Sequence, residues 1–133
     1  MKNRIVIITT GWFPEGDAGA IRLVMVGKAL LLCNYQVTVL CRGECNKRDR
    51  IEGIEYISLR GKFNSIIGKL IDYSRFPSKV KTYLESNKND LTGVYIYNAH
   101  ESVFMYCKSF CNKNRISLIH DCVEWYSPEE YKL

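Results

Sequence analysis

Five short apolar runs, rich in β-branched residues, alternate with longer segments along the chain. The runs occupy residues 4–10, 36–41, 54–59, 94–97 and 116–120. Short continuous apolar runs are typical of strands in a buried parallel sheet. Three of the intervening segments have the length and composition of helices: residues 19–33, 64–86 and 101–111. This alternation predicts an α/β domain with a Rossmann-like open parallel sheet of about five strands and helices on both faces.

The first helical segment, residues 19–33, follows a glycine-containing loop. Asp17 is suited to cap its start, and Asn34 is suited to the left-handed conformation that ends a helix. The segment is apolar almost all round and carries only two charges, so we expect it to be largely covered. Gly27 inside it lowers helix stability unless a close neighbour needs the space.

Two connecting segments predict irregular structure. Residues 42–52, between the second and third strands, are mostly polar or charged, which is typical of a loop. Pro77 lies inside the helical segment 64–86, and the residue before a proline is pushed out of helical geometry. We therefore expect two helical pieces there. The third strand, residues 54–59, is short and more polar than the others, so we place it near an edge of the sheet.

Length and composition indicate the class of protein. The chain has 133 residues, of which 47% are hydrophobic and 25% charged, and these fractions fit a single globular domain spanning residues 1–133. No apolar run approaches the roughly 20 residues that cross a bilayer, and the N-terminus lacks a signal-peptide core. We therefore expect a cytoplasmic protein. The six cysteines form no C-x-x-C pair, which favours free thiols over a metal site.

Positive charge is concentrated in one segment. Residues 60–88 contain seven basic and two acidic residues, a net charge of +5 that equals that of the whole chain. Apolar residues within the segment have helical spacing, and a basic amphipathic helix can lie on an anionic membrane. The membrane-facing residues would be Lys62, Phe63, Lys69, Arg75 and Phe76. The alternative is a helix packed on the sheet with a solvated basic face. Nucleic acid is not an expected partner, because no recognition module is visible.

The loop after the first strand is the first candidate site. It lies at the carboxyl end of that strand, where ligands bind in open parallel sheets. Gly16 and Gly19 permit close approach of a ligand, and backbone N–H groups at the start of the next helix favour an anion. A phosphate or a sugar hydroxyl is therefore the expected guest, unless the glycines only shape a turn. The G-x-G-x-x-G and Walker A patterns are absent, so a dinucleotide is not expected.

Two further stretches reach the same edge of the predicted sheet. His100 directly follows the fourth strand, so we expect it near residues 16–19, where an imidazole can move or hold a proton near neutral pH. Its alternative role is to cap the next helix. The fifth strand runs into Asp121 and Glu124, which are followed by Trp125, an aromatic suited to stacking on a sugar. The alternative is a surface loop whose aromatic residues cover the core.

These stretches resemble glycosyltransferase family 4. The stretch PEGDAGAIR, from Pro14 to Arg22, followed by ALLLCNYQVTVLC, resembles the opening of these enzymes. His100 matches the histidine that they carry after a strand near the middle of their N-terminal domain. The stretch IHDCVEWYSPEEY is similar to the D-x-x-E-W-Y-x-P segment of bacterial members that build surface polysaccharides. The three motifs occur in the family's order along essentially the whole chain.

The resemblance implies roles for residues at three places. The loop residues that would contact the acceptor or a phosphate are Gly16, Ala18, Gly19 and Arg22, with Ala18-Gly19 standing where the family typically has two glycines. His100 would orient the reacting sugar rather than act as a base. The acceptor pocket would be shaped by Asp121, Glu124 and Trp125.

The resemblance also implies a fold and an activity. Members have the GT-B fold, two Rossmann-like domains that face each other across a cleft, and this chain would correspond to an incomplete N-terminal, acceptor-side domain. The implied reaction is transfer of a sugar from a nucleotide-sugar to a lipid-linked or saccharide acceptor, in surface polysaccharide synthesis at the inner face of the membrane. The nucleotide-sugar would bind to a C-terminal donor domain or subunit outside this chain, so no cofactor is expected here.

Two other functions stay open from the sequence. The chain can be a non-catalytic subunit, or a decayed fragment, that needs a partner with a donor-binding domain. It can also be a nucleotide- or flavin-binding Rossmann-like module. Tight binding of a dinucleotide or flavin would distinguish the second function from a sugar-transfer domain.

Overall fold

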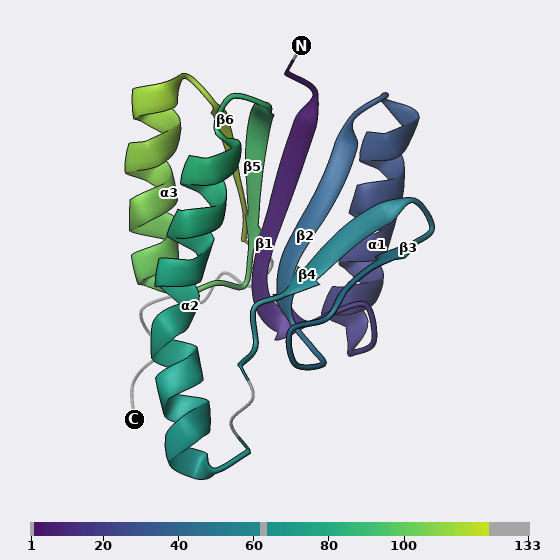
Figure 1. The fold of residues 1–133 in the computed structure, drawn as a ribbon. Helices are drawn as coiled ribbons and strands as arrows, with labels where there is room; N and C mark the ends of the chain where they lie inside the picture. Colours follow the sequence, from purple (N-terminus) through teal and green to yellow (C-terminus); the bar gives the residue numbers. More distant parts are fainter. Residues whose placement is uncertain (1, 62–63, 123–133) are drawn as a thin grey trace, which may run out of the picture.

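A six-stranded sheet forms the centre of the computed structural model, which describes residues 2–61 and 64–122 (Figure 1). The strand order is β3-β4-β2-β1-β5-β6. All neighbouring strands are parallel except β3 and β4, which are antiparallel. The strands are β1 (Arg4–Trp12), β2 (Gln36–Arg42), β3 (Arg48–Ile51), β4 (Ile54–Ser58), β5 (Leu91–Tyr97) and β6 (Ser117–Asp121). The mostly parallel order, with β1 in the interior, is consistent with the predicted Rossmann-like fold.

The sheet has six strands instead of the predicted five or so, and the strand that was not predicted is β3. It lies in the segment predicted as a charged loop and forms a hairpin with β4. The turn between them contains Glu52 and Gly53, both with positive φ. Arg48 donates two hydrogen bonds to the Glu55 carboxylate of β4, at 3.0 and 2.6 Å. β3 carries charged, exposed side chains, which suit an edge strand and leave no apolar pattern to detect.

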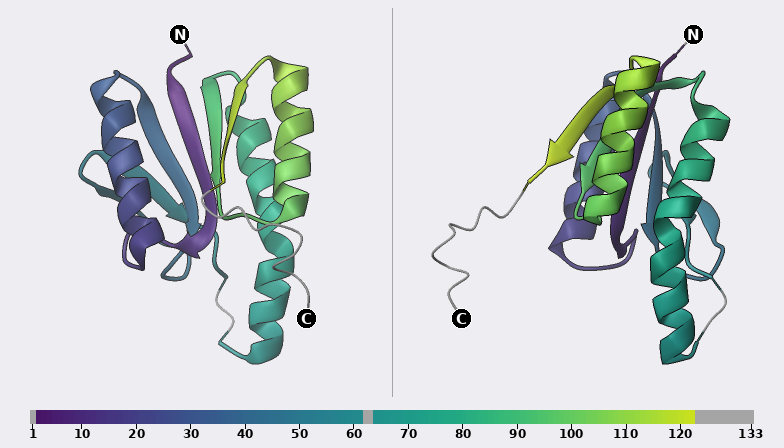
Figure 2. Two further views of the ribbon diagram at one scale, coloured as in Figure 1. Left: turned by 180° about the vertical axis from the view of Figure 1, so that it is seen from behind. Right: turned by 90° about the vertical axis from the view of Figure 1, so that its left-hand side faces the viewer.

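Three helices cover the sheet from both sides, as predicted (Figure 2). They are α1 (Ala18–Leu32), α2 (Ile66–Asn87) and α3 (Glu101–Asn114). Successive residues of β1 point to opposite faces: Ile7 shares a core cluster with Leu23 of α1, whereas Ile8 shares one with Val80 of α2 and Phe110 of α3. The sheet therefore separates two cores, with α1 on one face and α2 and α3 on the other.

The ends and the interior of α1 follow the sequence. The Asp17 carboxylate accepts a hydrogen bond from the Gly19 N–H at 2.9 Å, and Asn34, just past the helix, has a φ of 64°. A Cβ atom on Gly27 would lie 2.5 Å from Cδ1 of the buried Ile54, so this glycine is needed for the close packing of α1 on β4. The caps and the helix–sheet contact were thus both readable from single residues.

The prediction that α1 is largely covered is wrong. Its side chains Ile21, Met25 and Leu32 are exposed. Only one face of the helix meets the sheet, and among the described residues no second helix packs on that side. A helix with apolar residues on every side is therefore buried here on one side only.

The prediction of two helical pieces around Pro77 is also wrong, because α2 is continuous from Ile66 to Asn87. The side chain of Ser65 caps its start by accepting from the Gly68 N–H at 3.0 Å. The residue before the proline, Phe76, is only 2% exposed and belongs to the core. Burial of this ring holds the backbone in helical geometry against the local preference of an X-Pro pair. In the part of the chain that the structure describes, no helix is long and apolar enough to cross a membrane.

Candidate functional site

The loop after β1 folds over the end of β2. The backbone N–H of Phe13 donates to the carbonyl oxygen of Arg42 at 3.0 Å. The Phe13 ring is buried and packs edge-on against Tyr56, with ring centroids 5.7 Å apart. These contacts fix the start of the loop to the sheet, so the residues that follow reach α1 along a defined path at the carboxyl edge.

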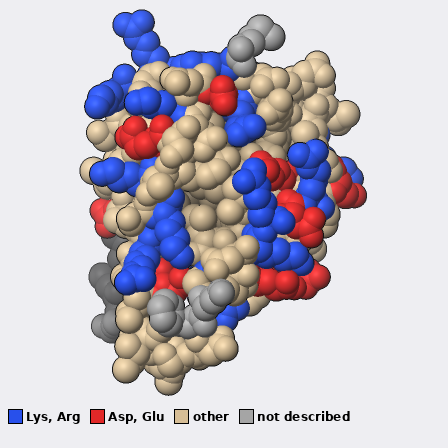
Figure 3. Space-filling view, in the orientation of Figure 1, with Lys and Arg blue, Asp and Glu red and all other residues tan. Residues whose placement is uncertain are grey.

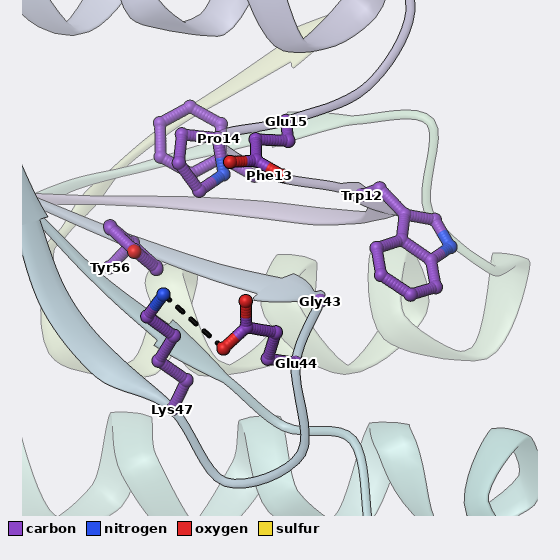
Figure 4. A pocket seen from close by; sticks show the side chains of 8 residues that line it. All are labelled: Trp12, Phe13, Pro14, Glu15, Gly43, Glu44, Lys47 and Tyr56. Carbon is purple, nitrogen blue, oxygen red and sulfur yellow. Dashed lines mark ion pairs between the residues drawn. The ribbon is translucent and has the colours of Figure 1, made fainter. Parts of the chain in front are cut away.

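A small cavity opens beside the start of this loop. Figure 4 shows the side chains that line it, with the ion pair of Lys47 Nζ and Glu44 Oε2 at 3.3 Å. The lining residues are Trp12, Phe13, Pro14, Glu15, Gly43, Glu44, Lys47 and Tyr56. The cavity volume of about 40 Å³ admits a few water molecules but no sugar ring. The cavity is therefore too small to enclose a saccharide.

The two predicted glycines of the loop serve close packing. A Cβ atom on Gly19 would lie 3.0 Å from both the Cε1 and Oη atoms of Tyr97, and one on Gly16 would lie 3.0 Å from the carbonyl oxygen of Trp12. The Gly19 N–H is already occupied by Asp17. Turn shape and contact with Tyr97 thus account for both glycines, and the Gly19 N–H is not free for a phosphate.

Arg22 and Asp121, predicted on separate motifs, meet at the carboxyl edge. The Nε and Nη2 atoms of Arg22 donate to the two carboxylate oxygens of Asp121 at 2.8 and 3.0 Å. The hydroxyl of Tyr95 donates to the same carboxylate. Asp121 is nearly buried, with its side chain 10% exposed, whereas that of Arg22 is about half exposed. The pair joins α1 to β6 across the end of β5, and Arg22 keeps further N–H donors toward solvent.

The ionisation of this cluster follows from its contacts. The hydrogen bond from Arg22 is the main cause that lowers the pKa of Asp121 below its ordinary value, so the carboxylate is charged at neutral pH. Burial, and then the hydrogen bond to Asp121, raises the pKa of Tyr95 to about 12. The cluster therefore presents an ionised acceptor beside a cation and a neutral phenol, a set that can bind sugar hydroxyls or an anionic group.

His100 lies on the other face of the sheet edge, against α2. It occupies the N-cap position of α3 but makes no side-chain capping bond. Its ring meets Tyr73 edge-on, with centroids 3.9 Å apart, and Phe76 lies at 6.3 Å. The Nε2 atom is buried and has no hydrogen-bond partner among the described residues. Burial, and to a lesser degree the charge of Arg42, lowers the pKa of His100, so the imidazole is neutral at pH 7.

The sequence placed His100 close to residues 16–19, and in the structure the contacts of the two lie on opposite faces of the sheet. The contacts of Gly19 are with Tyr97, which belongs to the core on the α1 side. Those of His100 are with Tyr73 and Phe76 on the α2 side. Both groups lie at the carboxyl edge, but they flank it from opposite faces, so a ligand that touches both has to extend across the strand ends.

The remaining predicted site residues divide into three groups. Glu124 and Trp125 of the acceptor pocket, and Lys62 and Phe63 of the membrane-facing set, lie outside the described residues. Lys69 and Arg75 are exposed on α2, and Ala18 is exposed at the start of α1. The prediction that Phe76 faces a membrane is wrong, because its ring is buried in the core between α2 and the sheet.

Three tyrosines were missed by the sequence analysis. Tyr95 and Tyr97 are two residues apart in a strand, so they point to one face, and that alternation was a usable signal. Tyr73 had no such signal, because its contact with His100 depends on where α2 crosses the sheet edge.

The cysteines and acidic residues form no metal centre in the described part of the chain. Residues 2–61 and 64–122 contain no group of three or more histidine, cysteine, aspartate or glutamate side chains that could hold an ion. Cys41, Cys107 and Cys111 are buried free thiols. Burial raises the pKa of Cys41 to about 12, which keeps this thiol protonated and unreactive.

Neither the models of known protein families nor the curated proteins contain a match to the chain.

Proposed function

We propose that this chain is the acceptor-side domain of a glycosyltransferase that moves a sugar from a nucleotide-sugar to a lipid-linked or saccharide acceptor. The observation that carries the proposal is the ion pair of Arg22 with Asp121. Arg22 ends the first stretch that resembles glycosyltransferase family 4, and Asp121 lies in the third such stretch, 99 residues away. Chance resemblances need not meet in space, whereas parts of one binding site do.

The cluster around Asp121 suits a sugar or sugar-phosphate ligand. The carboxylate accepts hydrogen bonds from hydroxyl groups, and the free N–H groups of Arg22 bind hydroxyl or phosphate oxygens. Tyr95 and Tyr97, on the same face of β5, add ring surfaces of the kind that pack against sugars. We assign acceptor binding to this cluster. Its backbone contribution comes from the region of Gly16 and Ala18, since the Gly19 N–H is occupied.

His100 is assigned a separate, orienting role. Its neutral ring leaves the Nε2 atom without a partner among the described residues, and a local movement that uncovers this buried atom would let it donate to or accept from one hydroxyl of the reacting sugar. The low pKa argues against an imidazolium there at neutral pH. Because His100 lies on the α2 side of the edge, the sugar that it contacts would lie across the strand ends from the acceptor cluster.

The donor is assigned to residues outside this chain. The resemblance implies that a nucleotide-sugar binds mainly to a second domain or subunit. The proposed activity therefore needs that partner, and the chain alone is expected to bind the acceptor without turnover.

Ligand titration followed by NMR tests the proposal. The isotope-labelled chain is titrated with farnesyl diphosphate-linked N-acetylglucosamine, a free oligosaccharide, UDP-glucose, FMN and NAD. We expect the amides of Gly16, Ala18 and Asp121 to shift with an acceptor compound and not with FMN or NAD. Asp121→Asn should weaken that binding by about tenfold or more, since it removes a charged acceptor. Asp49→Asn, on the exposed edge strand β3, is the matched control and should bind normally.

Three results would contradict the proposal. Tight binding of FMN or NAD at the loop would favour a nucleotide- or flavin-binding module. Sugar transfer by the pure chain would disprove the assignment of the donor to a partner. Equal binding by Asp121→Asn and the unmodified chain would remove the assigned acceptor site.

A further inference from the structure

The first half of α2 projects beyond the carboxyl edge of the sheet. Figure 1 shows this end of the helix below the ends of the strands, and the side view of Figure 2 shows it extending past the other helices. The projecting half, residues 66–75, begins at the Ser65 cap and ends where Phe76 enters the core. The sheet therefore does not cover this part of the helix.

The projecting half carries large apolar side chains in solvent. Ile66 is 79% exposed, Leu70 is 65% exposed, and Ile67, Ile71 and Tyr73 are also exposed. The lower end of the space-filling view is correspondingly almost free of charged atoms (Figure 3). Contiguous exposed apolar surface of this kind marks a place where a protein contacts a partner or a membrane.

Charge is arranged around the apolar side chains in a definite way. At about 3.6 residues per turn, residues 66, 67, 70 and 71 share one side of the helix, with Lys69 on one flank and Arg75 on the other. The single carboxylate of this half, Asp72, points away from solvent. It is 8% exposed, accepts from the Gly61 N–H at 2.6 Å and pairs with Lys79 at 3.5 Å. The outward side is thus apolar apart from Ser74, whose hydroxyl donates to the Ile71 carbonyl oxygen, and it has basic flanks and no carboxylate.

We propose that residues 66–75 dock this protein on an anionic lipid bilayer. Apolar side chains would enter the boundary between headgroups and acyl chains, and the two cations would contact anionic headgroups. A protein groove that receives an apolar helix needs no flanking cations. A second copy of this chain would bring the same positive charge against itself, so charge complementarity favours the bilayer over both.

Docking through residues 66–75 would bring the candidate site close to the membrane surface. Tyr73 is half exposed on the projecting half, and its ring contacts that of His100. The docking surface therefore lies next to the carboxyl edge of the sheet, past which this half of α2 extends (Figure 1). If the proposed function holds, the acceptor is lipid-linked and not a free saccharide, because docking through residues 66–75 would hold the edge that receives it close to the bilayer.

Vesicle co-sedimentation tests the docking directly. The chain is mixed with vesicles of phosphatidylcholine alone, or of phosphatidylcholine with phosphatidylglycerol, at low and high salt. We expect binding to the anionic vesicles, weaker binding in high salt, and little binding to the neutral ones. Leu70→Asp should lower the bound fraction by about tenfold or more, because a carboxylate replaces an inserted apolar side chain.

Leu32→Asp provides a matched control. Leu32 is 87% exposed on α1, so the substitution makes the same chemical change on an apolar side chain outside the docking surface. It should leave vesicle binding unchanged, and circular dichroism should show both variants folded. Equal binding by Leu70→Asp and the unmodified chain would overturn the proposal. So would the absence of binding to anionic vesicles, or a dimer in solution that Leu70→Asp dissociates.

The two proposals can fail separately. Vesicle binding requires no sugar, so it can succeed even if no acceptor binds. The chain could bind anionic vesicles and yet prefer a free oligosaccharide to the farnesyl-linked sugar. That result would support the bilayer contact and contradict the lipid-linked acceptor.

Discussion

The two halves of α2 carry similar apolar residues in opposite surroundings. In the second half, Phe76, Val80 and Leu84 recur at helical spacing and are buried in the core between α2, α3 and the sheet. In the first half, Ile66 and Leu70 recur at the same spacing and are exposed. The sequence pattern of the two halves is the same in kind, so the pattern predicts an amphipathic helix without saying what covers its apolar side.

The length and position of α2 relative to the sheet explain why one half is buried and the other is exposed. With 22 residues, α2 is about 33 Å long, whereas β5, with seven residues, spans about 23 Å. α2 is about 10 Å longer than this strand and is displaced toward the carboxyl edge, so the sheet does not cover it along its whole length (Figure 1). The uncovered part extends past the carboxyl edge, which is also where the candidate site lies.

The largest expected effect is a loss in the free energy of unfolding when a large apolar side chain is removed from the buried half of α2 but not from the exposed half. Phe76→Ala should lower the free energy of unfolding by about 3–5 kcal/mol, because it leaves a cavity in the core. Leu70→Ala should change it by less than about 0.5 kcal/mol, since this side chain is exposed in the free protein. Urea denaturation at neutral pH measures both.

The opposite ranking would break the comparison. A loss of more than about 2 kcal/mol for Leu70→Ala would mean that the first half packs against something in the free protein. Leu84→Ala, on the same buried side as Phe76, should destabilise by about 2–5 kcal/mol and shows whether the burial extends along the second half.

Pro77, at the junction of the halves, gives the second effect. A proline inside a helix has no N–H to donate to the carbonyl four residues earlier, here that of Tyr73. Pro77→Ala restores that donor and should raise the free energy of unfolding by about 1–2 kcal/mol, less than the ~3 kcal/mol of an inserted proline because the surroundings are adapted to the ring. Thermal and urea unfolding measure it.

The exposed neighbour of Pro77 supplies the control. Ser78→Ala should change the stability by less than about 0.5 kcal/mol. A loss of stability in Pro77→Ala would show that the pyrrolidine ring itself is needed to hold the two halves together.

The sequence predicted the parts of the fold that depend on neighbouring residues. The caps at Asp17 and Asn34, the close contact at Gly27 and the alternation of strands with helices are all confirmed. β3 was missed because its charged side chains are held by pairing with β4 and not by burial. Continuity of α2 through Pro77 was missed because the core contacts of Phe76 override the local preference.

The sequence predicts at which edge of the sheet the candidate site lies, but it does not predict which side chains meet there. Parallel strands bring their carboxyl ends together, so Arg22, His100 and Asp121 were expected at one edge. Which of them meet depends on side-chain direction. Arg22 and Asp121 lie on the α1 side and pair, while His100 turns to the α2 side against Tyr73. Arg22 and His100 lie outside the strands, so strand alternation in the local sequence does not show to which face each of them turns.

The smallest expected effect is the pH dependence of stability that comes from His100, whose ring contacts both halves of α2. Its pKa in the folded chain lies below the ordinary value of 6.5, mainly because of burial and then because of Arg42. Well above pH 6.5 the imidazole is neutral in both states and contributes no pH dependence. As the pH falls below 6.5, the unfolded chain binds a proton more readily than the folded chain, so stability falls until the folded pKa is passed.

Urea unfolding at pH 7.5 and pH 5 measures this loss. His100→Gln should show a smaller loss between the two pH values than the unmodified chain, because it removes the group that titrates against burial. His120→Gln is the matched control: it replaces the other histidine, which is exposed, and should keep the loss. If His100→Gln loses as much stability as the unmodified chain, the junction of the two halves does not hold the imidazole neutral, and the orienting role proposed for His100 loses its physical basis.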